Sequence, residues 1–127
     1  MTATRALPKT NGFIGLGATT PIERLTTVEG KAGAGGAVTV KPLLVGNDMV
    51  LIEILQDKGT LVPKHQHDDH ESVIYLVRGR MRLVIDGKES VVRTGDSWIH
   101  PRGVPHYSEA LEECLCIEVK SPPRKTW

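Results

Sequence analysis

Four residues of this sequence have types and spacing suited to holding a metal ion. His65 and His67 are two positions apart, so their imidazoles project from the same face of an extended strand. Glu71 follows a polar Asp-Asp-His step, which would let the chain turn and bring a carboxylate back beside the two rings. His106, further along the chain, is the fourth candidate. Imidazoles with one carboxylate form a nitrogen and oxygen donor set that suits several divalent transition metals.

The segments that must position these residues have the pattern of short β-strands. From Val38 onward, apolar and β-branched runs alternate with turns, and Asp86-Gly87 is a two-residue hairpin signal. The one helical signal is a Thr-Pro start at residues 20–25, long enough for a turn or two. The pattern predicts an antiparallel sandwich or barrel, in which alternate residues point inward and neighbouring strands deliver ligands to one point. The expected strands are residues 38–45, 49–55, 72–77, 80–85, 88–93, 97–100 and 114–119, with the metal-ligand strand before residue 72.

Composition and charge exclude several function classes. The 127 residues are enough for one domain with its own core. The formal net charge of +1 gives no strong field for nucleic acid or a membrane surface, and no apolar run is long enough to span a bilayer. No apolar segment follows Arg5 and Lys9, as it would in a secretory signal. Cys114 and Cys116 are too close on one strand to pair, so we expect reduced thiols in a cytoplasmic protein.

Two longer motifs contain the four candidate ligands. Gly59-x5-His65-x-His67-x3-Glu71-x7-Gly79 resembles the first cupin motif, and Gly95-x5-Pro101-x-Gly103-x2-His106 resembles the second. The resemblance implies an all-β, single-domain cupin with an antiparallel β-barrel of the jelly-roll type. It also implies that the four candidates bind one divalent transition metal ion in each subunit. The resemblance begins near residue 40, so we expect residues 1–37 to form an N-terminal extension and residues 38–127 to form the barrel domain.

Three further residues lie close to these motifs. His70, between Asp69 and Glu71, is interpreted as a solvated turn residue. His100 either faces the rim of the pocket as a proton shuttle or makes a structural hydrogen bond. Tyr75 has the same strand parity as Glu71 and is a candidate substrate contact, with a place in the core as the alternative.

The final strand carries a charged pair whose environment decides its role. Cys116, Glu118 and Lys120 share one face of this strand. If that face looks into the barrel, Glu118 and Lys120 form a partly desolvated pair with shifted pKa values, suited to acid and base catalysis. If it lies at the open end in water, they form an ordinary surface ion pair. Arg124 follows two prolines, and either clamps a substrate carboxylate through its planar fork or is exposed.

The C-terminal tail is similar to that of pectin-degradation cupins of the KdgF type, which help to open unsaturated uronates into linear keto sugars. In that tail pattern Glu118 matches an aspartate, Arg124 matches an arginine, and Lys120 replaces an aromatic residue. This subfamily often has glutamine at the position of Glu71. The similarity implies that the tail contributes a substrate site beside the metal ligands.

These features predict a small homodimeric cupin with one bound metal ion. Iron, manganese, nickel, zinc, cobalt and copper all suit the ligand set, and the sequence does not choose among them. The expected activity is isomerase or lyase chemistry on a uronate or keto acid, with the metal as a Lewis acid. The alternatives are an iron-dependent dioxygenase and a non-catalytic module that binds or senses a small molecule. No nucleic acid or membrane partner is expected.

Overall fold

The computed structural model describes residues 5–127, and the regular secondary structure of these residues is β-strand throughout. This confirms the all-β prediction. The strands are β1 (Glu23–Leu25), β2 (Thr27–Val28), β3 (Lys31–Ala32), β4 (Val38–Val45), β5 (Val50–Gln56), β6 (Leu61–His65), β7 (Glu71–Arg78), β8 (Arg80–Ile85), β9 (Lys88–Arg93), β10 (Ser97–His100), β11 (His106–Ala110) and β12 (Cys114–Ser121).

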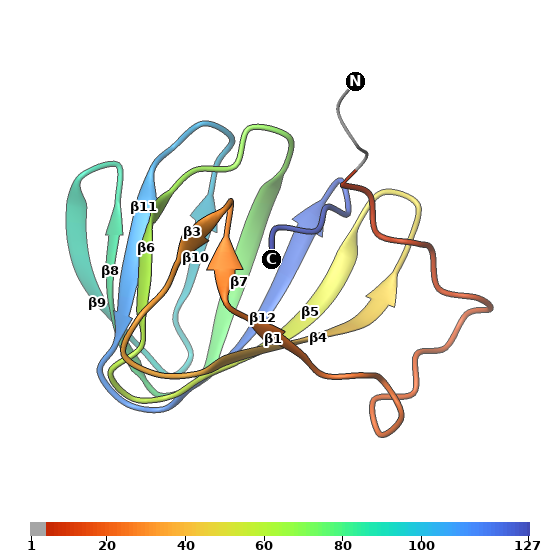
Figure 1. Cartoon of the computed structure of the whole chain (residues 1–127), viewed down its shortest axis with the longest axis horizontal. Coiled ribbons are helices and arrows are strands. Elements are labelled where there is room, and N and C mark those ends of the chain that lie inside the picture. Colours follow the sequence, from red (N-terminus) through yellow and green to blue (C-terminus); the bar gives the residue numbers. More distant parts are fainter. Residues whose placement is uncertain (1–4) are drawn as a thin grey trace.

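Two antiparallel sheets face each other and enclose the interior (Figure 1). The larger sheet has six strands in the order β1-β4-β5-β12-β7-β10, and the smaller has four in the order β6-β11-β8-β9. β12 lies between β5 and β7 and pairs with both along its length. The short β2–β3 sheet lies against β6. The antiparallel double-sheet arrangement predicted from the strand pattern is therefore present.

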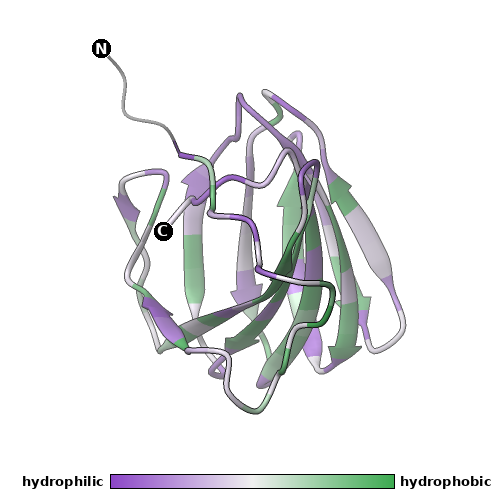
Figure 2. Cartoon of the chain, turned by 90° about the vertical axis from the view of Figure 1, so that its right-hand side faces the viewer, coloured by the Kyte–Doolittle hydropathy of each residue, from purple (hydrophilic) through white to green (hydrophobic). Residues whose placement is uncertain are grey.

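Alternation along the strands builds the core. On β12 every second residue from Cys114 to Lys120 is buried, and on β7 the second, fourth and sixth residues are buried. One apolar cluster contains Leu76 and a second contains Ile52. Figure 2 shows hydrophobic and hydrophilic residues alternating along the strands. Apolar side chains therefore fill much of the space between the sheets, beside the polar residues of β12.

Two expectations from composition can be compared with the structure. Cys114 and Cys116 are buried free thiols, which confirms that they do not pair with each other. Within residues 5–127, no helix is long and apolar enough to cross a membrane.

The helical turn expected at residues 20–25 is not formed. Glu23–Leu25 instead make β1, which pairs with β4. The hydroxyl of Thr20 donates a hydrogen bond of 2.9 Å to the carbonyl of Leu16 and caps no helix. The edge of β4 explains the difference, because an added strand satisfies its unpaired backbone groups. The N-terminal segment (residues 5–37) thus adds a strand to the large sheet.

Gly79, which joins β7 to β8, lies where the chain has little space for a side chain. Its φ is 112°, and a Cβ there would lie 2.5 Å from the carbonyl oxygen of Glu113 and 2.8 Å from Sγ of Cys114. We predict that Gly79→Ala lowers the free energy of unfolding by about 2–4 kcal/mol, because backbone strain adds to overpacking. Urea denaturation measures this loss.

Gly87→Ala is the matched control. Gly87 also has a positive φ, 77°, but no atom lies within 4 Å of its added Cβ. For Gly87→Ala we expect the free energy of unfolding to fall by only about 1–2 kcal/mol, the cost of placing a non-glycine residue at a positive φ. Equal losses in the two variants would contradict the predicted clash at Gly79.

Candidate metal centre

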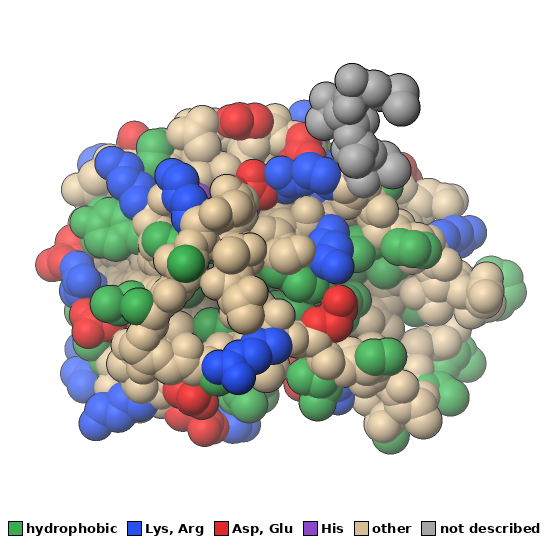
Figure 3. Space-filling view, in the orientation of Figure 1, with side chains coloured by type: hydrophobic (Ala, Val, Ile, Leu, Met, Phe, Trp, Pro, Cys, Tyr) green, Lys and Arg blue, Asp and Glu red, His purple; other side chains and the backbone are tan. Residues whose placement is uncertain are grey.

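Three histidines converge where β6 and β11 lie side by side. His65 ends β6, His67 lies two residues beyond it, and His106 begins β11. The antiparallel register places His65 opposite His106. All three side chains are buried, and their ligand atoms lie within 4.8 Å of one another. Figure 3 shows almost no histidine surface on the face that it presents. The structure therefore brings together three of the four predicted metal ligands.

Hydrogen bonds hold two of these rings with the same nitrogen facing the cluster. Nδ1 of His65 lies 2.6 Å from the carbonyl oxygen of the residue two positions earlier, and Nδ1 of His106 makes the same contact at 3.2 Å. A carbonyl only accepts, so Nδ1 carries the proton and Nε2 keeps its lone pair. Nδ1 of His67 lies 3.5 Å from Oε1 of Glu29. Neutral imidazoles with Nε2 free are a donor set that fits a divalent transition metal.

Burial keeps these rings neutral. Loss of hydration disfavours the imidazolium form and lowers the pKa of His65, His67 and His106, and neighbouring histidines lower the last two further. The pKa of His106 is lowered to about 4. Near neutral pH a metal ion would therefore displace no proton from Nε2 of these rings.

The fourth predicted ligand, Glu71, lies outside the cluster. It is the first residue of β7 and its side chain is exposed, whereas the next residue, Ser72, is buried. Successive side chains of a strand point to opposite faces. If the inward-facing set is assigned one residue off, every side chain of the strand is therefore assigned to the wrong face. Tyr75 shares the outward phase and is 48% exposed. Contrary to the prediction, the structure brings neither Glu71 nor Tyr75 to the site, and Tyr75 is not a core residue either.

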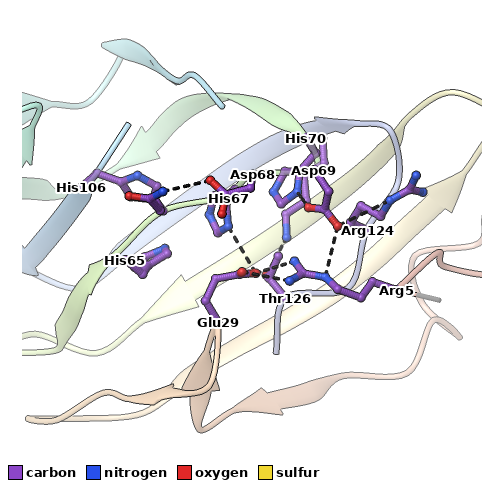
Figure 4. Close-up of polar contacts among 12 residues, drawn as sticks. Arg5, Glu29, His65, His67, Asp68, Asp69, His70, His106, Arg124 and Thr126 are labelled. Atoms are coloured by element: carbon purple, nitrogen blue, oxygen red, sulfur yellow. Dashed lines mark hydrogen bonds and ion pairs between the residues drawn. The ribbon is translucent and has the colours of Figure 1, made fainter. Parts of the chain in front are cut away.

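His70 takes an inward position instead. Its side chain is fully buried, and its ring centroid lies 4.4 Å from that of His67. Nδ1 lies 2.8 Å from Oδ1 of Asp69, whereas Nε2 has no hydrogen-bond partner among the described residues. The interpretation of His70 as a solvated residue is wrong, because the loop between β6 and β7 turns this ring against His67 (Figure 4).

The histidine cluster faces an interior cavity of about 90 Å³. Its wall combines apolar side chains of both sheets with a few polar groups, as is typical of sites for small molecules. Besides the three histidines of the cluster, these polar groups include His100, Glu118 and Lys120. The C-terminal residues Thr126 and Trp127 also line the cavity.

His100 lies directly against one of the clustered histidines. Its ring stacks on that of His106, with centroids 3.5 Å apart and planes inclined by 10°. Nε1 of Trp98 donates a hydrogen bond of 3.3 Å to Nε2 of His100, and Nδ1 of His100 has no partner in the described part of the chain. The structural hydrogen bond is thus present, and the ring also lines the cavity.

Glu118 and Lys120 point into the barrel, which decides between the two alternatives for the final strand. Both side chains are buried, and Nζ of Lys120 lies 3.8 Å from Oε2 of Glu118. Nζ also donates a hydrogen bond of 2.7 Å to Oγ1 of Thr126. Burial raises the pKa of Glu118 and lowers that of Lys120, and the attraction between them offsets part of each shift. The pair therefore has the desolvated environment and the shifted pKa values that were expected if this face looked into the barrel.

Arg124 does not line the cavity. Its Nε lies 3.7 Å from Oδ2 of Asp69, and its backbone bridges to Ala6. A substrate carboxylate at Arg124 would compete with Asp69. The clamp on a substrate carboxylate stays a prediction.

Sequence reasoning missed the N-terminal contribution to the site. Glu29, in the turn between β2 and β3, reaches His67, and Arg5 contacts both Glu29 and Asp69 (Figure 4). These residues lie far from the two motifs in the chain, so no local spacing connects them. The one local signal is Gly30, which suits the second position of a tight hairpin turn.

Two facing antiparallel sheets with a buried histidine cluster between them define a class of small β-barrel proteins built around a candidate metal site. Residues 52–119 match the family described as the Cupin domain, and the chain belongs to this family. The resemblance carried by the two histidine motifs is thereby confirmed.

Two similar proteins have different named functions. The pectin degradation protein KdgF of Dickeya dadantii (strain 3937) is 28% identical over 91 residues, which are 71% of this chain and 83% of that protein. Oxalate decarboxylase OxdC of Bacillus subtilis (strain 168) is 31% identical over 88 residues, 65% of this chain but 23% of that protein.

Solved structures extend the likeness to most of the chain. KdgF from Halomonas sp. has a TM-score of 0.75 and 22% identity, covering 88% of this chain and 96% of that one. An RmlC-like cupin from Shewanella frigidimarina NCIMB 400 has a TM-score of 0.78 and 26% identity, covering 93% and 97%. The similarity to KdgF proteins first seen in the tail thus holds for sequence and for fold.

Metal binding can separate the inward from the outward residues. We predict that His106→Ala lowers the affinity for zinc more than about 100-fold, because it removes a ligand itself. Glu71→Ala should leave the affinity unchanged, because this side chain is exposed. Chelator competition measures both, with circular dichroism to confirm folding. An equal loss in Glu71→Ala would contradict the outward phase of β7.

The lowered pKa of His106 predicts that the metal-free protein is sensitive to acid. In the unfolded chain the ring gains a proton below about pH 6.5, whereas in the fold its pKa is about 4. The unfolded state therefore binds more protons in this window, and stability present above pH 6.5 is lost as the pH falls to 4.

The size of this effect can be measured by urea denaturation at a series of pH values. The shift corresponds to about 3 kcal/mol for one histidine. His106→Asn carries no titrating ring, so its stability should fall by about that much less over the same interval. An identical pH dependence in the two proteins would contradict the prediction.

Proposed function

We propose that this cupin is a metal-dependent enzyme that acts on a small oxygen-rich substrate, such as a uronate or a keto acid, by isomerase or lyase chemistry. One observation carries the proposal: three imidazoles and the buried pair Glu118 and Lys120 line the same cavity. The similarity to a pectin degradation protein and to an oxalate decarboxylase supports a substrate that bears a carboxylate.

His65, His67 and His106 would hold a divalent transition metal through Nε2. When bound, the ion supplies Lewis-acid polarisation of a carbonyl or hydroxyl oxygen. Three protein donors are fewer than the four of a closed structural site, as expected where substrate oxygens must also bind.

Glu118 is the proton carrier in this proposal. Burial raises the pKa of its carboxyl, and a general acid or base works best when its pKa lies near the operating pH. In an isomerisation, Glu118 takes a proton from one substrate atom and returns it to another, so its own charge is restored. The Lys120 ammonium, 3.8 Å away, stabilises the carboxylate form and offers a positive charge to an acidic substrate.

A homodimer is part of the same proposal. The outer face of the large sheet exposes a group of apolar side chains, and Val73 on β7 pairs in register with Ile99 on β10. Val73 is 50% exposed and Ile99 45%. Tyr75, on the same face, is an amphipathic residue of the kind enriched in interfaces. A second copy of the chain covering this face would remove these apolar side chains from water.

Replacement of Glu118 tests the mechanism. Glu118→Gln keeps the shape of the side chain but cannot carry the proton, so turnover of an unsaturated uronate should fall about 100-fold or more. Zinc content should persist, because Glu118 is not one of the clustered ligands. Turnover is followed by NMR, and metal content by elemental analysis.

Glu113→Gln is the control, because Glu113 is exposed and pairs with Arg78 at the surface. Unchanged turnover in Glu118→Gln would remove this residue from the mechanism. Oxygen uptake by an iron-loaded protein would identify the dioxygenase instead, and binding of uronates without turnover would identify a sensor.

A further inference from the structure

The turn between β2 and β3 places a carboxylate beside the histidine cluster. Glu29 and Gly30 form this two-residue turn, and both have positive φ values, 50° and 78°. The backbone N–H of Glu29 donates a hydrogen bond of 2.9 Å to the carbonyl of Thr126. On the other side, Nζ of Lys31, the residue after the turn, donates a hydrogen bond of 3.0 Å to the carbonyl of Lys64 on β6. The turn is therefore held from two directions near the end of β6.

Glu29 takes the place at His67 that carbonyl oxygens take at the other two rings. Nδ1 of His65 and of His106 each faces a carbonyl oxygen, at 2.6 and 3.2 Å. Nδ1 of His67 is buried and has no hydrogen-bond partner among the described residues, while Oε1 of Glu29 lies 3.5 Å away. A carboxylate facing Nδ1 favours the tautomer whose Nε2 lone pair is free for a metal, and it raises the basicity of the ring.

Arg5 holds this carboxylate in place. Its guanidinium donates to both oxygens of Glu29, from Nη1 to Oε2 at 2.9 Å and from Nη2 to Oε1. Nε of Arg5 lies 3.3 Å from Oδ2 of Asp69, whose Oδ1 contacts Nδ1 of His70. The carbonyl of Arg5 accepts a hydrogen bond of 2.7 Å from the backbone of Lys125. One arginine of the N-terminal segment thus joins the two carboxylates that face buried histidines (Figure 4).

We propose that Glu29 is a positioning residue of the metal centre, supplied by the N-terminal segment through its contact with Nδ1 of His67. Arg5 extends this role, because its bonds to Glu29 and Asp69 couple the docking of the segment to the geometry of the site. The inference rests on the proposed metal centre and adds a residue from outside both histidine motifs. The coupling is reciprocal: any gain in metal affinity from a docked segment is also a gain in docking from bound metal.

Zinc affinity measured by chelator competition tests the role of Glu29. Glu29→Ala should weaken zinc binding about 10–100-fold, as is usual when a partner of a ligating histidine is lost. Glu29→Gln should lose less, because its amide oxygen can still face Nδ1 of His67, although without the negative charge. The absorption spectrum of the cobalt-loaded protein should change in Glu29→Ala, because the orientation of His67 is no longer fixed.

Two controls separate failure of this inference from failure of the metal centre. Glu23→Ala, in the same segment but paired with Lys125 at 3.6 Å, should bind zinc as the wild type does. His106→Ala should lose zinc. Wild-type affinity in Glu29→Ala together with loss in His106→Ala would overturn the role of Glu29 and leave the metal centre intact. Wild-type affinity in His106→Ala would overturn both. If Glu29→Ala does not fold, the near-isosteric Glu29→Gln decides by the same criteria.

Limited proteolysis measures the coupling from the other direction. Lys9 and Arg24 are exposed sites for trypsin in the N-terminal segment. Zinc should slow cleavage at these sites in the wild type. The slowing should be at most as large as the fold-loss of zinc affinity that Glu29→Ala causes, because the coupling is reciprocal. Zinc should slow cleavage less in Glu29→Ala at saturating zinc. Equal protection in the two proteins would overturn the coupling.

Discussion

The pairing of β6 with β11 is the constraint on which the site depends. Its register sets His65 opposite His106, so imidazoles from two distant segments meet without help from a mobile loop. Backbone hydrogen bonds of the ladder position His65 and His106, and the carbonyl contacts at their Nδ1 atoms leave Nε2 as the free nitrogen of each ring. A shift of one residue in the register between β6 and β11 would turn His65 to the opposite face of the sheet and separate it from His106. Strand pairing thus preorganises two of the three donors of the candidate metal centre.

The interior holds more charge than stability alone would favour. Glu118 and Lys120 are both buried and lie 3.8 Å apart. A buried ion pair often contributes little net stability, because desolvation of two charges consumes most of the Coulombic attraction. The apolar clusters around Leu76 and Ile52 supply the hydrophobic burial that stabilises the fold. The polar residues Glu118 and Lys120 of β12 line the cavity beside them. The cost of burying this pair is one that a functional role explains.

The two ends of the described chain meet over the site. The N–H of Leu7 donates a hydrogen bond of 3.1 Å to the carbonyl of Pro123, and the turn at Glu29 bonds to Thr126. The match to the Cupin domain covers residues 52–119, so both contacts lie outside it. The barrel supplies the histidines, whereas segments on either side of it supply Arg5 and Glu29 and part of the cavity wall.

By itself the sequence determined most of the strands after residue 38, the hairpin at Asp86-Gly87 and the three histidines of the candidate metal centre, because these follow from local alternation, turn chemistry and short spacings. It also showed that Glu118 and Lys120 share a face. It did not predict β1, β2 and β3. A period of two says which residues lie together, but not which face looks inward. Packing of the second sheet decided that, and it buried the pair on β12 while turning Glu71 out to solvent. The approach of Glu29 to His67 was likewise decided by the tertiary structure, because it joins segments that no periodic pattern connects.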